Sequence, residues 1–221
     1  MLATMIVETI LALWTLLRYR QGLFGKVAAA ILLLLAMFQA SEYQVCGNHS
    51  AEIWSRLGLV AITLLPVLGL RLIHLITRQK HFVFLGALLA AAFVLYFIFA
   101  PRHDVSSFCG GNYIIFTGPG SLYEFFGAYY FGFLILSIWQ ALTAKRETPS
   151  RLLQSILRWV VAGYLSFMLP LGVVYAVYAP ARVAVASIMC GFAVIFALIL
   201  AFEIVPKFYR YAARTSKAKN D

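Results

Sequence analysis

Six side chains of the kinds that bind metal ions lie in two short stretches of the chain, residues 42–49 and 103–109. A zinc site needs three or four such side chains at about 2.0–2.3 Å from the ion. The sequence has no HExxH, HxxxH or paired CxxC pattern, in which close spacing brings ligands together. It therefore favours solvated loop side chains, and no bound metal is predicted. The six residues are Glu42, Cys46, His49, His103, Asp104 and Cys109.

Two of these residues, Cys46 and Cys109, are able to bond to each other. Cys46 follows the second apolar run and Cys109 lies in the longest link between runs, so both are expected on the outer side of a membrane. Disulfides persist in that compartment. The sequence predicts a bridge that ties the link to the rest of the protein, with free thiols as the alternative. Cys190 lies among apolar residues and is predicted to be a small core residue.

A polar face marks the end of the second apolar run. Gln39, Glu42, Tyr43 and Cys46 are spaced i, i+3, i+4 and i+7, which places them on one side of a helix. Polar side chains within a membrane usually point to the bundle interior or to a watery cavity, because lipid does not satisfy them. This face therefore predicts a polar surface inside the protein.

Other charged residues are expected near the same membrane surface. Glu52 and Arg56 are four residues apart on one helix and are expected to pair. The pattern predicts an outward-opening pocket that binds a small molecule or a segment of another protein. Interfacial anchors and ion pairs that hold helix ends are the alternative. The predicted ligand-binding residues are Glu8, Gln39, Glu42, Tyr43, Arg56, Tyr123 and Glu124.

The elements that must position these residues are transmembrane helices. Of the 221 residues, 63% are hydrophobic and 12% are charged, whereas soluble domains carry about 25% charged residues. Seven apolar runs approach the roughly 20 residues that a spanning helix needs, so the predicted fold is an all-α, polytopic membrane protein with seven transmembrane helices. The link at 101–120 is expected to be a lid or binding loop. The runs are about 2–17, 25–45, 53–76, 82–100, 121–143, 153–178 and 182–205.

Two prolines and several glycines occur within these runs. Pro66 and Pro170 are predicted to lie inside helices, where proline removes a backbone hydrogen bond and favours a kink. The glycines are expected to allow close approach of neighbouring helices. They are Gly127, Gly132, Gly163, Gly172 and Gly191.

Lysine and arginine are distributed unevenly between the links. The net charge is +10, but the basic residues lie between and after apolar runs, which argues against nucleic-acid binding. Because Lys and Arg remain on the cytoplasmic side, the N-terminus is predicted outside and the C-terminus inside. One side carries Arg18, Arg20, Lys26, Arg78, Lys80, Lys145, Arg146, Arg151, Lys207, Arg210, Arg214, Lys217 and Lys219, and the other Arg56, Arg102 and Arg182.

The chain is predicted to hold one transmembrane domain, residues 1–205, and a basic cytoplasmic tail, residues 206–221. The tail is expected to be disordered and close to anionic lipid. No cofactor is expected. Retinal needs a lysine within a late span, haem needs facing histidines, and the glycine-rich stretch at 116–124 lacks the lysine of a P-loop.

Short motifs in residues 1–205 resemble a known family. Trp54, Arg56 and Leu57 begin the third run, Pro66 follows, and Gly118 and Pro119 precede an aromatic-rich run. This pattern is similar to the seven-helix sensor module at the N-terminus of many bacterial histidine kinases and diguanylate cyclases. The resemblance implies a bacterial cytoplasmic membrane protein that passes a signal to an output domain. Because the chain ends about fifteen residues after the last run, a stand-alone module acting on a membrane or cytoplasmic signalling partner is expected.

The function expected from the sequence is therefore a sensor or receptor-like membrane protein, and no catalytic residue is predicted. Three other classes stay open. A small transporter or channel would need polar residues along a path through the membrane, and a metal-dependent intramembrane enzyme would use the Cys, His, Glu and Asp residues of the outer side. An accessory subunit of a membrane complex would leave no separate pattern.

Overall fold

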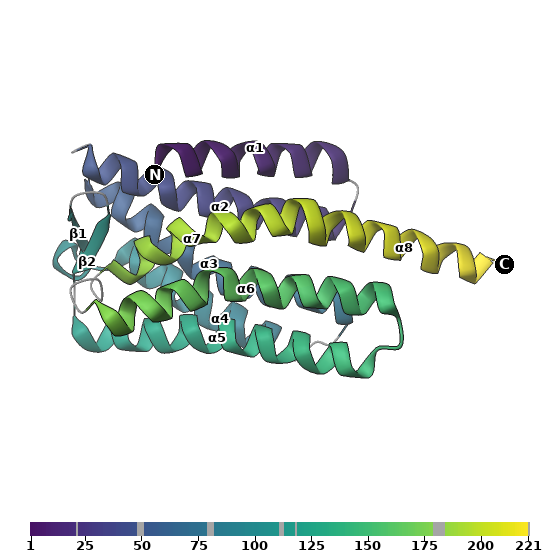
Figure 1. Cartoon of the computed structure of the whole chain (residues 1–221). Helices are drawn as coiled ribbons and strands as arrows, with labels where there is room; N and C mark the ends of the chain where they lie inside the picture. Colours follow the sequence, from purple (N-terminus) through teal and green to yellow (C-terminus); the bar gives the residue numbers. More distant parts are fainter. Residues whose placement is uncertain are drawn as a thin grey trace.

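Helices make up most of the protein (Figure 1). The computed structural model describes residues 1–20, 22–47, 51–78, 82–110, 113–117, 119–178 and 184–220. Each of the seven predicted apolar runs forms a helix, and Pro66 and Pro170 lie within helices, as predicted. The helices are α1 (Leu2–Tyr19), α2 (Leu23–Cys46), α3 (Ala51–Thr77), α4 (Val83–Phe99), α5 (Gly120–Glu147), α6 (Arg151–Val177), α7 (Val185–Ile199) and α8 (Val205–Asn220).

The helices lie roughly along one common direction, with the two chain termini at opposite ends (Figure 1). We call the end that holds the N-terminus and two short strands the hairpin end, and the end reached by α8 the tail end. Six described helices are long and apolar enough to cross a membrane, with α7 and α8 counted as one span from Val185 to Thr215. The α4 helix, with 17 residues, is about 26 Å long at 1.5 Å per residue, slightly short of a bilayer core of about 30 Å.

Large apolar side chains cover the outside of the bundle. Phe84 and Phe99 on α4 are 82% and 79% exposed, and Leu17 on α1 is 78% exposed. Exposure of such a surface to water would be unfavourable, whereas contact with lipid tails would not, because the tails are as apolar as these side chains. Together with the six long helices, this surface confirms the prediction of an integral membrane protein.

The long link contains a β-hairpin that the sequence analysis did not predict. Strand β1 (Ser106–Cys109) pairs antiparallel with β2 (Ile114–Thr117), and Cys109 lies opposite Ile114. Four-residue strands are too short to show a clear alternation of apolar and polar residues. The fold is therefore helical, as predicted, with one small hairpin in addition.

The tail is also more ordered than expected. A π-helical turn, η3 (Leu200–Ile204), joins α7 to α8, and α8 continues to Asn220 where a disordered tail was predicted. Pro206 has no N–H to donate to the preceding turn, which favours a wider turn at this point. Lys207 strengthens the junction, because it pairs with Glu203 and its Nζ lies 4.8 Å from the centre of the Trp159 ring.

Of the five glycines predicted to allow close packing, the structure places one at a tight contact. A Cβ at Gly163 would lie 2.7 Å from a ring carbon of Phe196, whereas a Cβ at Gly127, Gly132, Gly172 or Gly191 would meet nothing within 4 Å. The prediction was therefore wrong for these four, since glycine spacing does not show which helix face meets a neighbour.

Gly163→Ala is expected to destabilise the protein by about 1–3 kcal/mol, because the added methyl group pushes Phe196 out of its packed position. Gly172→Ala is the matched control on the same helix, and it should leave stability within about 0.5 kcal/mol. Unfolding of both variants in mixed detergent micelles measures the difference. Equal stabilities would contradict the tight contact.

Candidate functional site

The hairpin is fastened to three helices at one end of the bundle. A disulfide joins Cys46 at the end of α2 to Cys109 of β1, with Cα atoms 5.0 Å apart, which confirms the predicted bridge. The Ser55 hydroxyl of α3 is hydrogen-bonded to the Ser107 hydroxyl of β1. The Ile114 N–H of β2 donates to Ser187 Oγ of α7 at 3.0 Å. The hairpin therefore holds the ends of α2, α3 and α7 in fixed positions.

Arg56, one of the predicted ligand-binding residues, has a structural role at this end. Its guanidinium donates hydrogen bonds to the carbonyl oxygens of Phe97, Ile98 and Ala100 at 2.8, 2.9 and 2.8 Å. These carbonyls belong to the end of α4, where helix geometry leaves them without N–H partners. Arg56 also pairs with Glu52 at 3.2 Å, as predicted. Its donors therefore face α4 and Glu52.

The other predicted residues are divided between separate places. Tyr43 is 46% exposed on the surface of α2. Tyr123 and Glu124 of α5 line one cavity, while Gln39 and Glu42 of α2 line another. Glu8 of α1 is completely buried. The structure thus brings Gln39 and Glu42 together, with Glu8 near enough to interact electrostatically with Glu42. Tyr43, Arg56, Tyr123 and Glu124 lie outside that group.

The cavity beside Glu42, which we call the acidic recess, has a volume of about 240 Å³. Polar groups come to it from the N-terminus, α2, the hairpin and α7. Ser187 was missed by the sequence analysis, although it is a hydroxyl residue within an otherwise apolar helix. The recess is lined by Met1, Thr4, Gln39, Glu42, Tyr113, Ser187, Ile188 and Gly191.

The carboxyl group of Glu42 in the recess, and that of nearby Glu8, lack part of their hydrogen bonding. Glu8 is 0% and Glu42 2% exposed. Within the described part of the chain, three carboxyl oxygens have no hydrogen-bond partner. They are both oxygens of Glu8 and Oε1 of Glu42. Glu42 does interact with the Ser187 hydroxyl and the Ile114 backbone. A buried polar group without a partner costs several kcal/mol, so both side chains have unused capacity for a hydrogen-bond donor.

Two acidic side chains and the amino group of Met1 determine the electrostatics of the recess. Glu8 and Glu42 are close enough to act on each other electrostatically, and the amino group of Met1 attracts both. No ion pair to either carboxylate occurs among the residues that the structure describes. An ammonium group has three donors and would satisfy carboxylate oxygens here.

A second, larger cavity lies on the other side of α7. We call it the aromatic cavity, and its volume is about 550 Å³. Apolar and aromatic side chains from α3, β2, α5, α6 and α7 form its walls, with Glu124 at an exposed position. Ser187, Ile188 and Gly191 of α7 face the recess, while Val185, Ala186 and Met189 face the aromatic cavity. The half of α7 near the hairpin end therefore divides the two cavities.

The residues considered as metal ligands do not form a cluster. Cys46 and Cys109 are joined to each other. Within residues 1–47, 51–78, 82–110 and the other described ranges, no group of three or more His, Cys, Asp or Glu side chains is positioned to hold a metal ion. His49 and the side chain of Asp104 lie outside the described part.

The fold and the site define a helical membrane protein with a polar recess at one end of the bundle. Comparison of the chain with protein-family models, curated proteins and solved structures finds no match. The recess and the helices that surround it are therefore the features that indicate a function.

Proposed function

We propose that this chain is a receptor-like membrane protein, and that its acidic recess binds a small molecule carrying an ammonium group. The observation that carries the proposal is the pair of buried carboxylic side chains, Glu8 and Glu42, with oxygens that have no described hydrogen-bond partner. Ionisable residues within a membrane are costly and usually functional. A cationic ligand would supply the missing donors and the opposite charge.

We further propose that the hairpin end faces the outside and the tail end the cytoplasm of a bacterial cell. Two features support this orientation. The disulfide lies at the hairpin end, and disulfides persist in oxidising compartments. The links at the opposite end carry most of the lysine and arginine, which is typical of the cytoplasmic side.

The α7 helix is suited to relay binding to the tail end. It contributes Ser187 and Gly191 to the recess and continues through the π-helical turn into α8. A π-helical turn is a frequent feature of functional sites. A ligand that binds one position of α7 better than another shifts the population towards that position. Signalling would then consist of a movement of α8.

Benzylamine and butylamine are expected to raise the melting temperature of the purified protein, whereas benzyl alcohol and butanol, which have a similar shape without the charge, should not. Glu42→Gln is expected to weaken amine binding about tenfold or more, because it removes a charge-assisted hydrogen bond. Glu124→Gln is the matched control, since Glu124 lines the other cavity.

Gly191→Val tests the position of the ligand without changing a carboxylate. A Cβ at Gly191 would meet nothing within 4 Å, and the residue lines the recess, so valine should fill the space and block the amine. Amine binding that survives both Glu42→Gln and Gly191→Val would overturn the proposed site.

Relay to the tail is measured separately. An environment-sensitive dye on Ala213→Cys, in a Cys190→Ala background, should change its fluorescence when benzylamine binds, and should not change in the Glu42→Gln variant. If the dye does not respond when the amine binds, the protein binds amines but does not relay binding to α8.

A further inference from the structure

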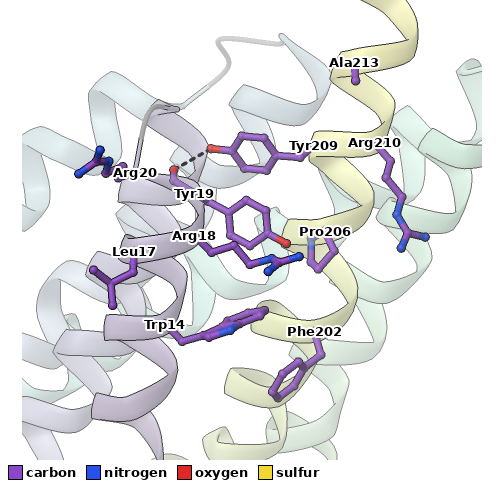
Figure 2. Close-up of a pocket in the computed structure, with 10 residues that line it drawn as sticks. All are labelled: Trp14, Leu17, Arg18, Tyr19, Arg20, Phe202, Pro206, Tyr209, Arg210 and Ala213. Atoms are coloured by element: carbon purple, nitrogen blue, oxygen red, sulfur yellow. Dashed lines mark hydrogen bonds between the residues drawn. The ribbon is translucent and has the colours of Figure 1, made fainter.

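A third cavity lies at the tail end, between α1 and α8, far along the bundle from the acidic recess (Figure 1). We call it the basic groove, and its volume is about 870 Å³. It is lined by Trp14, Leu17, Arg18, Tyr19, Arg20, Phe202, Pro206, Tyr209, Arg210 and Ala213 (Figure 2).

We propose that the basic groove binds an anionic phospholipid of the membrane, with the headgroup phosphate on the arginines and an acyl chain along the aromatic floor. The function proposed for the acidic recess is not needed for this inference, because the groove is built from other residues at the opposite end.

The charge of the groove is positive and unbalanced. Arg18, Arg20 and Arg210 line it, and none of the described residues around it is acidic. No ion pair holds these three arginines within the part of the chain that the structure describes. Figure 2 shows the guanidinium of Arg18 between the two helices beside Pro206, while the guanidinium groups of Arg20 and Arg210 lie on either side and point away from it. Arginine binds phosphate oxygens through paired N–H groups, so the groove fits a phosphate anion.

The groove is basic towards the tail end and apolar farther from it, just as a phospholipid has a charged headgroup and apolar acyl chains. Trp14 and Phe202 lie deeper, with ring centres 5.3 Å apart, and the arginines lie closer to the tail end (Figure 2). Leu17 and Phe202 are 78% and 54% exposed, and in a membrane protein lipid covers such side chains. A soluble phosphate would use only the basic part, whereas a phospholipid uses both.

The floor of the groove is held in a fixed shape. The Tyr19 and Tyr209 rings stack with centres 4.7 Å apart, and Tyr209 Oη donates to the Tyr19 carbonyl at 3.0 Å. The Arg18 guanidinium carbon lies 6.0 Å from the centres of the Trp14 and Tyr19 rings, within the range of a cation–π contact. The site is therefore largely formed before a ligand binds. Basic pockets between helices on the cytoplasmic side are typical sites for anionic headgroups.

The test compares two lipids with the same acyl chains on the full-length protein. Native mass spectrometry after titration with phosphatidylglycerol or phosphatidylcholine should show tighter retention of phosphatidylglycerol. Each arginine that contacts the headgroup is expected to contribute about fivefold. Arg18→Gln with Arg210→Gln should therefore reduce this preference about 25-fold, and Arg18→Lys, which keeps the charge but loses the paired N–H groups, should reduce it less.

Arg146→Gln is the control, because Arg146 is exposed near the tail-side end of α5 and does not line the groove. It should leave the lipid preference unchanged. Equal retention of the two lipids, or a preference that persists in the Arg18 and Arg210 double variant, would overturn the proposal. Displacement of phosphatidylglycerol by inorganic phosphate at the same concentration would assign the groove to a soluble anion and also overturn it. Elution of every variant as one monodisperse peak from gel filtration verifies folding.

Discussion

Replacing Cys46 and Cys109 together by serine is expected to lower the free energy of unfolding by about 2–4 kcal/mol. The disulfide closes a loop with a sequence separation of 63 residues, so its loss gives the unfolded chain much more conformational freedom. It also releases β1 from α2, which leaves the hairpin attached through Ser107 and Ile114. Unfolding by SDS titration in mixed micelles measures the change.

The single variants provide the internal control. Cys46→Ser, Cys109→Ser and the double variant all break the same bond, so their losses should be equal within about 0.5 kcal/mol and should not add. Reduction of the wild-type protein should reproduce the loss, and reduction of the double variant should change nothing. Single-variant losses that sum in the double variant would mean that each cysteine acts independently of the bridge.

A consequence for the recess follows from the same change. Tyr113, which lines the acidic recess, precedes β2, and β2 is held against β1. A hairpin without its disulfide should position Tyr113 less precisely and weaken amine binding. The disulfide therefore contributes to the recess as well as to stability.

Arg56→Met is expected to destabilise the protein by about 2–4 kcal/mol. The substitution removes the donors for the carbonyls of Phe97, Ile98 and Ala100 at the end of α4. These carbonyls lie at a helix end with few other partners, and an unsatisfied buried acceptor is costly. Arg56→Lys should give an intermediate loss, because one ammonium group does not reproduce the fork of a guanidinium. The same SDS titration measures both variants.

Arg102→Gln is the control that removes only an ion pair to Glu52 and leaves the hydrogen bonds of Arg56 to the α4 carbonyls in place. Arg102 contacts Glu52 at 2.7 Å, but its side chain is 85% exposed, compared with 18% for Arg56. Exposed ion pairs contribute about 0–1 kcal/mol, so the loss should be small. Hydrogen exchange at the end of α4 should increase in Arg56→Met and stay unchanged in Arg102→Gln. Equal effects of the two variants would show that the helix-end carbonyls do not need Arg56.

The amino-acid sequence alone predicted the class of the protein and the positions of its helices. Apolar length depends on local composition, and it located each of the seven helices to within a few residues. The pairing of Cys46 with Cys109 was also predicted, because both cysteines were expected on the outer side of the membrane, where disulfides persist. The amphipathic spacing indicated an inward-facing polar surface, and Gln39 and Glu42 of that face are buried, whereas Tyr43 of the same face is exposed.

Tertiary structure decided which polar residues share a site. Glu42 interacts with Ser187, which is distant in the chain, and electrostatically with Glu8. Arg56, in contrast, turns to the end of α4, and Glu124 lies in a different cavity. These contacts depend on the rotation of each helix about its axis and on which helices are neighbours. The sequence indicates the depth of a residue in the membrane, but depth determines neither the rotation nor the neighbours. The basic groove arises in the same way, since Arg18 and Arg210 come from the first and last helices and line one groove because α1 packs beside the α7–α8 helix.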